Sequence, residues 1–252
     1  LDAGYNIVAA NKKANTSSLG YYRAMREAER RNFRKFLYET NVAAGLPLID
    51  TLQSLIRSGD ELETFEGILS GSLSMIFGLL QDGIPLSQAV AKAMELGYTE
   101  PDPRDDLSGM DVARKLLIIA REVGLRQELD DIAVEPVVPM GAVEHVDRSE
   151  LIDALAAQDT AFAERCAAAA AEGKVLRYVA RLEDGQCRVS IEAVDRAGPL
   201  GAIRDGENAL VIHSRYYQPI PMVLRGYGAG ASVTAAGVFG DLLKTVWRPL
   251  DN

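Results

Sequence analysis

Amphipathic stretches with a period near 3.6 residues recur along the chain and predict a series of helices. The clearest covers 111–123, where apolar residues return every three or four positions from Val112 to Val123. Hydroxyl residues precede several of these stretches, as expected of helix caps, and Ser70 is one example. The pattern predicts helices at 19–35, 48–58, 70–79, 87–96, 111–123, 149–172 and 232–246.

Shorter apolar runs between these stretches predict strands. Two of them, 175–182 and 187–194, flank a turn at 183–186 that contains Asp184-Gly185 and therefore form a β-hairpin. The other expected strands lie at 7–10, 36–38, 64–69, 210–212 and 222–224. A strand followed by a helix at the start of the chain is typical of an α/β unit, so the expected fold class is α/β.

Composition places the chain among folded proteins and narrows its partners. Its 252 residues are 48% hydrophobic and 25% charged, which permits a proper core and excludes disordered and collagen-like architectures. Against 27 Lys and Arg stand 36 Asp and Glu, a net charge of −9. Because such a field repels phosphate backbones, we expect no nucleic-acid partner.

Rare residue types exclude further classes. The two cysteines, Cys166 and Cys187, form no Cys-x-x-Cys motif, so we interpret them as reduced thiols of a cytoplasmic protein. Only His145 and His213 are available as histidine ligands, which excludes a zinc site built from several histidines. No apolar run reaches the ~18 residues of a membrane span, so no membrane partner is expected.

The most informative stretch is acidic and covers 97–111, with five carboxylates within the twelve positions from Glu100 to Asp111. Pro101 and Pro103 restrict its backbone, so it is a stiff loop. A rigid acidic cup suits the ammonium group of an amino acid. The alternative is a solvated turn whose acids cap the next helix, and the residues alone leave both open.

Two lysines stand at positions where they could serve a ligand. Lys115 follows Asp111 by four residues and therefore shares its helix face, either as a proton shuttle oriented by the carboxylate or as a surface ion pair. Spacing alone favours the ion pair. The other is Lys12 in the stretch 11–13, at the end of an expected parallel strand, where open α/β sheets bind ligands.

Two further stretches could bind smaller groups. The segment 39–45 offers one carboxylate and several carbonyl oxygens to a hard cation. The glycine-rich segment 226–230 precedes a helix, whose amides could receive phosphate or nicotinamide, although such segments are more often tightly packed turns. The Gly-x-Gly-x-x-Gly fingerprint of dinucleotide-binding domains is absent from the sequence.

These stretches together resemble homoserine dehydrogenase, most closely the dehydrogenase half of the bifunctional aspartokinase–homoserine dehydrogenases. The resemblance spans the chain in order, and the run from Gly97 to Lys115 is specific enough to name the family by itself. The other matching stretches are 11–18, 40–42, 45–47, 67–74, 228–230 and 233–238.

The resemblance implies an NAD(P)-dependent interconversion of L-homoserine and L-aspartate 4-semialdehyde, a step toward threonine and methionine. It implies that Lys115, Lys12 and Asp111 are catalytic, and that Glu100 and Asp106 bind substrate together with Lys12. The residues that it implies for the cofactor are Asn11, Lys12 and Gly230, and those for a monovalent cation (Na⁺ or K⁺) are Glu39, Val42, Ala44 and Leu46.

The resemblance also implies a domain organisation. We expect 1–35 and 220–252 to be the remnant of a Rossmann-like nucleotide-binding domain. Residues 36–219 are expected to be an α+β catalytic domain with a mixed sheet covered by helices, which also forms a homodimer or higher homo-oligomer. No regulatory segment is recognisable toward the end of the chain, which fits the bifunctional type.

Two departures from the family pattern qualify this expectation. The chain begins on Leu1 without the Gly-rich turn that holds the dinucleotide pyrophosphate, so we expect a fragment impaired in cofactor binding. Ala43 replaces a glycine common in relatives, which disfavours a positive φ there. The alternatives are a non-catalytic dimerising fragment and another amino-acid dehydrogenase. Aspartate-semialdehyde dehydrogenase fits poorly, because neither cysteine has a convincing nucleophile setting.

Overall fold

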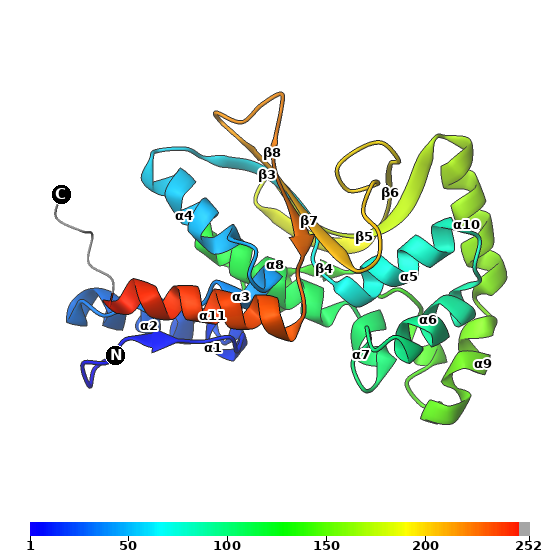
Figure 1. Ribbon diagram of the computed structural model, residues 1–252, viewed down its shortest axis with the longest axis horizontal. Coiled ribbons are helices and arrows are strands. Elements are labelled where there is room, and N and C mark those ends of the chain that lie inside the picture. Colours follow the sequence, from blue (N-terminus) through cyan, green and yellow to red (C-terminus); the bar gives the residue numbers. More distant parts are fainter. Residues whose placement is uncertain (247–252) are drawn as a thin grey trace.

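A computed structural model describes residues 1–246, and its centre is a six-stranded mixed sheet (Figure 1). The strand order is β4-β6-β5-β3-β7-β8, with β4 parallel to β6 and the other neighbours antiparallel. The strands are β3 (Leu62–Ile68), β4 (Ala133–Val134), β5 (Lys174–Glu183), β6 (Gln186–Asp195), β7 (Glu207–Ser214) and β8 (Met222–Tyr227). The expected mixed sheet is confirmed.

The predicted hairpin joins β5 to β6. Asp184 and Gly185 form its two-residue loop with φ angles of 51° and 73°, the left-handed backbone that an Asp-Gly pair adopts in a tight hairpin. Val179 and Ala180 are fully buried in the middle of β5, because helices cover one face there and the segment after β6 covers the other. Strand β5 of the hairpin is therefore buried on both faces of the sheet.

Helices pack on one face of the sheet, and α8 (Met110–Glu122) is the most deeply buried of them. An amphipathic helix was expected here, but Leu117 and Ile118 outside the predicted stripe are buried as well. The reason is that α8 contacts β5 and β6 on one side and the short helices before β3 on the other. The remaining helices of this layer are α4 (Leu48–Arg57), α5 (Gly71–Gln81), α6 (Leu86–Glu95), α9 (Leu151–Ala156) and α10 (Asp159–Ala171).

The single helix expected over 149–172 is wrong, because the chain bends between α9 and α10. At the bend, Asp159 turns its carboxylate to the start of α6, where it accepts hydrogen bonds from the amide and hydroxyl of Ser87 at 2.8 and 2.7 Å. The bend lets α9 pack on α6 while α10 packs on β5. The alanine-rich composition predicts helix without predicting where the helix turns.

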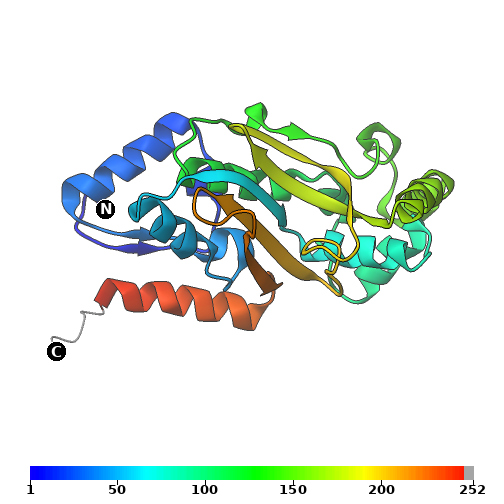
Figure 2. The same cartoon turned by 90° about the horizontal axis from the view of Figure 1, so that it is seen from above.

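A second, smaller unit lies beside the large sheet (Figure 2). Strands β1 (Ile7–Val8) and β2 (Phe36–Leu37) pair in parallel, and α2 (Leu19–Asn32) connects them. From the other end of the chain, α11 (Ala231–Val246) packs against β1. Segments from both ends of the chain thus lie side by side in this unit.

Several short elements escaped the sequence patterns. They are α1 (Lys13–Thr16), α3 (Thr40–Ala43), α7 (Pro103–Leu107) and 3₁₀ turns at Leu129–Asp131, Met140–Ala142 and Arg148–Glu150. The start of α7 carries a recognisable signal, since Asp102 caps it and Pro103 occupies its first turn. No helix within residues 1–246 combines the length and apolarity needed to cross a membrane.

Candidate active site

A pocket of about 290 Å³ opens where the first turns of α5 and α8 meet the acidic loop and the glycine-rich segment before α11. Four of the carboxylate and lysine residues singled out from the sequence line it, and Gly230 lines it from the opposite side. Those four are Glu100, Asp106, Asp111 and Lys115. The structure therefore gathers into one pocket residues that are up to 130 positions apart in the sequence.

Asp111 forms the centre of the charged cluster at this pocket. Its Oδ2 lies 2.9 Å from Nζ of Lys115, and its Oδ1 lies 3.1 Å from Nζ of Lys12. Burial acts to raise the pKa of Asp111, but the two ammonium groups outweigh it and the pKa is lowered. One carboxylate thus joins the lysine of the small unit to the lysine of the large one.

Lys115 is held more tightly than a surface ion pair requires. Its side chain is 12% exposed, and its Nζ also donates to the carbonyl of Leu69 at 2.7 Å. An ammonium group has three N–H donors. Asp111 and Leu69 account for two of them, so one is available to an oxygen atom inside the pocket that Lys115 lines.

The acidic loop divides its carboxylates between two tasks. Asp102 caps α7 and pairs with Arg104 at 2.6 Å, while the Arg104 guanidinium also donates to backbone carbonyls of the segment after β4. Asp105 is exposed and does not line the pocket. Three carboxylates remain at the pocket, whereas Asp102 caps a helix as the alternative interpretation expects.

Asp106 is fixed by hydrogen bonds on both of its oxygens. Oδ1 accepts from the Ser72 hydroxyl at 2.5 Å, and Oδ2 accepts from the backbone amide of Glu100 at 2.8 Å. Burial raises the pKa of Asp106, and these two hydrogen bonds offset part of that effect. Sequence patterns missed Ser72 because its only signal is its place in the first turn of a predicted helix.

The glycine-rich segment closes the other side of the pocket. Gly230 has a φ of 118°, a backbone conformation that favours glycine. A Cβ atom on Gly228 would lie 1.9 Å from Nδ2 of Asn208, so this position admits no side chain without movement. Asn208 is fully buried, and neither polar atom of its carboxamide has a hydrogen-bond partner among the described residues.

Asn11 lies just before α1, and its side chain fixes the backbone there. Its Oδ1 accepts from the amide of Lys13 at 2.8 Å, which turns the chain after β1 and presents Lys12 to Asp111. Asn11 itself does not line the pocket. Behind it, the guanidinium of Arg121, which is buried, donates to the carbonyls of Asn15 and Ser17 at 2.8 and 2.7 Å.

The residues assigned to a cation lie outside the pocket. The Glu39 carboxylate accepts the amides of Ile49 and Asp50 at the start of α4, and burial raises its pKa to about 7 although both hydrogen bonds lower it. The carbonyl of Leu46 accepts the amide of Leu48, and Val42 is buried. Within residues 1–246 no group of three or more acidic, histidine or cysteine side chains could hold a metal, so a cation here would need main-chain carbonyls.

The positive φ of this segment falls on the residue after Ala43. Ala43 ends α3 with helical backbone, and Ala44 has a φ of 49°. The backbone of Gly45 lies close to α11, because a Cβ atom on Gly45 would lie 2.5 Å from the carbonyl oxygen of Val233. The segment is therefore pressed against α11, which links the cation candidate to the small unit.

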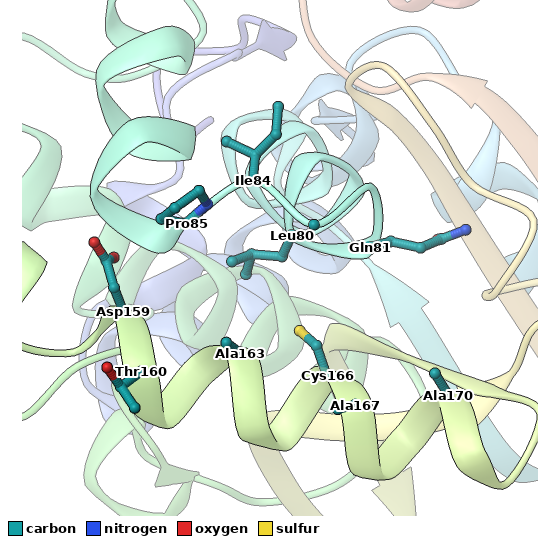
Figure 3. Close-up of a pocket in the computed structure, with 11 residues that line it drawn as sticks. Leu80, Gln81, Ile84, Pro85, Asp159, Thr160, Ala163, Cys166, Ala167 and Ala170 are labelled. Carbon is teal, nitrogen blue, oxygen red and sulfur yellow. The ribbon is translucent and has the colours of Figure 1, made fainter.

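A larger cavity of about 480 Å³ lies elsewhere, between the end of α5, the start of α6 and α10 (Figure 3). Its walls are mainly apolar or small, including Leu80, Ile84 and Ala163. Burial raises the pKa of the Cys166 thiol there, and Asp159 is occupied by Ser87. None of the residues singled out as a site from the sequence lines this cavity.

Known proteins match nearly the whole of this chain. A bifunctional aspartokinase/homoserine dehydrogenase of Haemophilus influenzae is 57% identical over 246 residues, which is 98% of this chain and 30% of that protein. One from Escherichia coli K12 is 41% identical over 95% of this chain and 30% of its own length. The chain thus spans about 30% of these relatives.

Solved structures share the fold. A Candida auris protein of unknown function superimposes with a TM-score of 0.93 and 37% identity, covering 98% of this chain and 71% of that one. A putative homoserine dehydrogenase of Archaeoglobus fulgidus gives 0.77 and 26% over 96% of this chain and 67% of its own. The family model described as homoserine dehydrogenase matches residues 47–243, and this chain therefore belongs to the homoserine dehydrogenase family.

Proposed function

We propose that this chain carries the substrate site of an NAD(P)-dependent homoserine dehydrogenase, which interconverts L-homoserine and L-aspartate 4-semialdehyde. The observation that carries the proposal is the pair of lysines on Asp111 at the edge of a pocket that Glu100 and Asp106 also line. Lys115, which can carry a proton, thus lies in the same pocket as the carboxylates of Glu100 and Asp106. The relatives are named as bifunctional enzymes, so we place the activity beside an aspartokinase in threonine and methionine biosynthesis.

The acidic side of the pocket suits the amino group of the substrate. Glu100 and Asp106 present carboxylates to the same space, and an ammonium group between them would offset their mutual repulsion. The fixed position of Asp106 matters because a pre-oriented group loses little freedom when a ligand binds. In this proposal the cup orients the substrate and takes no part in bond making.

Lys115 is the group that moves the proton. In the oxidation of the alcohol, its neutral amine would take the hydroxyl proton, and in the reverse direction its ammonium would return a proton to the aldehyde oxygen. The N–H that Asp111 and Leu69 leave available is the one that faces this oxygen. Lys12 adds a second positive charge that would stabilise developing negative charge on the same atom.

The residues of the opposite side fit one end of a dinucleotide. Gly230 brings bare backbone to the pocket just before α11, whose first amides suit a polar or anionic group. When bound, the nicotinamide would accept a hydride from the alcohol carbon of homoserine, or donate one to the aldehyde carbon in the reverse direction. Calorimetric titration of the natural full-length protein with NAD and with NADP measures its preference between the two cofactors.

Replacement of Lys115 by alanine tests the proposed function. In the natural full-length protein, K115A is expected to lower kcat for homoserine oxidation by about a hundredfold or more, the range for loss of a general acid or base. Lys92→Ala is the matched control, because Lys92 is an exposed lysine of α6 that pairs with Glu95 of the same helix. A K115A enzyme with the wild-type rate would refute the assignment.

We propose three further properties, which rest on membership of the homoserine dehydrogenase family and not on the pocket. A monovalent cation binds near Glu39, and addition of Na⁺ or K⁺ is expected to raise the midpoint of thermal unfolding. The chain forms a homodimer or higher homo-oligomer, and its mass by analytical sedimentation tests this. Strand β8 lies at one edge of the sheet, where Tyr227 is exposed, and is a surface available for such an interface. The enzyme works in the cytoplasm.

A further inference from the structure

A chain of hydroxyl groups runs from the first turn of α5 to the carboxylate of Asp106. Ser70 caps the helix, and its Oγ accepts the amide of Leu73 at 3.2 Å. The hydroxyls of Ser70 and Ser72 lie 2.8 Å apart. Ser72 in turn lies 2.5 Å from Oδ1 of Asp106. Each distance is that of a hydrogen bond, so the helix terminus is connected to the pocket.

The direction of every hydrogen bond in this row of hydroxyl groups follows from the carboxylate of Asp106 at its end. The ionised Asp106 only accepts, so the single hydroxyl proton of Ser72 points to it. Ser72 has then no proton left for Ser70, which must donate to Ser72. The amide of Leu73 donates to Ser70. All donors therefore point the same way, and such aligned hydrogen bonds strengthen one another.

We propose that Ser70 and Ser72 form a directional hydrogen-bond relay that fixes the carboxylate of Asp106 and keeps it ionised at the substrate pocket. Both serines line the pocket, and we assign them as positioning residues because their hydroxyl groups form the relay to Asp106. The relay extends the positive end of α5 to a carboxylate that lies 34 positions further along the chain than Ser72. The proposal rests on the function proposed above, in which Asp106 binds the amino group of the substrate.

The surroundings of Asp106 make such support necessary. Burial favours the neutral carboxyl, and the negative charges of Glu100 and Asp111 act in the same direction. Lys115 lines the same pocket, but its Nζ bonds Asp111 and the Leu69 carbonyl, and its third N–H is the one proposed for the substrate oxygen. Hydrogen bonds from Ser72 and from the Glu100 amide are what remains to stabilise the ionised form.

Helix α5 itself offers a matched control. Ser74 lies one turn from Ser70 and is buried, yet its Oγ has no hydrogen-bond partner among the described residues. A loss that reflects only disturbance of the helix would appear on replacement of either Ser72 or Ser74. A loss that reflects the relay would appear for Ser72 alone.

The test measures the pH dependence of kcat/KM for homoserine oxidation in the natural full-length protein. In S72A the midpoint of the acid limb is expected to move up by about one pH unit, as expected when a carboxylate loses one charge-assisted hydrogen bond. KM is expected to rise about tenfold with a smaller change in kcat. S72T, which keeps the hydroxyl, is expected to restore the wild-type midpoint, and S74A to leave it unchanged.

Infrared spectroscopy separates this proposal from the proposed function, because it requires no turnover. The carboxylic-acid band that disappears in Asp106→Asn reports the protonation of Asp106, and in S72A it is expected to persist to higher pH. If that band shifts while the wild-type protein does not oxidise homoserine, the relay stands and the proposed function fails. If the protein is active but S72A changes neither the band nor the acid limb, the relay is refuted.

The serine at the start of the relay provides a second variant if S72A does not fold. Ser70→Ala removes the donor to Ser72 and leaves the hydrogen bond to Asp106 in place. A shift of the Asp106 band in the same direction but smaller than one pH unit is expected. An unshifted band in a folded S70A protein would overturn the relay.

Discussion

The two sides of the pocket are held in place by different kinds of contact. On the side of α5 and α8, charged and hydroxyl groups are fixed by hydrogen bonds, and α8 is buried nearly all round. On the side of α11, glycine backbone lies against neighbouring atoms, and the helix leaves Phe239 and Leu242 59% and 49% exposed. The first side is rigid by its own bonds, whereas the second depends on what it packs against.

Two contacts join α8 to the small unit, to which α11 also belongs, and they explain how separate segments form one site. Asp111 binds Lys12 directly. At the other end of the same helix, Arg121 holds the backbone of α1 through two carbonyls. Helix α8 therefore fixes both the position and the charge environment of Lys12. The comparison teaches that the pocket depends on the docking of the small unit as much as on its own residues.

The largest expected effect breaks the contact at the pocket. Asp111→Asn leaves two lysines without the carboxylate that separates them, so the variant is expected to lower kcat/KM for homoserine by about a hundredfold or more. Steady-state kinetics of the natural full-length protein measures it. Asp105→Asn, an exposed acid of the same stretch, is the control and should stay within twofold of wild type.

The next effect breaks the contact at the far end of α8. Arg121→Met removes a buried guanidinium that bonds Asn15, Ser17 and the carbonyl of Gln127, and unfolding by urea is expected to show a loss of about 3 kcal/mol. Arg114→Met lies on the exposed face of the same helix and should change stability by less than about 0.5 kcal/mol. Equal losses in the two variants would contradict the docking role.

A smaller effect concerns the glycine side. Gly228→Ala forces a methyl group onto the buried Asn208 carboxamide and is expected to cost about 1–3 kcal/mol of stability. The affinity for NADPH should fall with it, which calorimetry measures. Because the carboxamide is the obstacle, the double variant G228A/N208A should recover part of the loss. Absence of any recovery would show that the strain lies elsewhere.

The smallest effect is a pH dependence of stability on the charged side. The pKa of Asp111 is lowered in the folded state, so its ion pairs contribute fully above the unfolded value near 3.8 and are lost as pH falls through the folded value. The stability difference between wild type and Asp111→Asn is therefore expected to shrink below about pH 4. Urea unfolding at several pH values measures this, and a constant difference down to pH 2 would contradict it.

Much of the fold follows from local patterns. The Asp184-Gly185 hairpin forms as predicted because two left-handed residues close a two-residue loop. Ser70 caps a helix as predicted because its hydroxyl satisfies a free amide. The bend between α9 and α10 escaped prediction, since alanines favour helix equally along the whole stretch and the bend depends on a contact with Ser87.

The candidate site shows the same division. Lys115 and Asp111 share a helix face by spacing alone, which the sequence determines because the helical repeat is local. The sequence likewise determines the acidic stretch, the glycine-rich segment and the family. Spacing favoured a surface ion pair for Lys115, yet the structure buries most of its side chain against Leu69.

Only the tertiary structure decides which groups meet across long separations. It brings Lys12 to Asp111, Ser72 to Asp106 and Gly228 to Asn208, and it separates Asp102 and Asp105 from the cup. The physical reason is that these contacts depend on the packing of α1 on α8, of α5 on α7 and of the glycine-rich segment on β7. Hydrophobic and polar patterns record which face of an element is buried, but not which partner buries it.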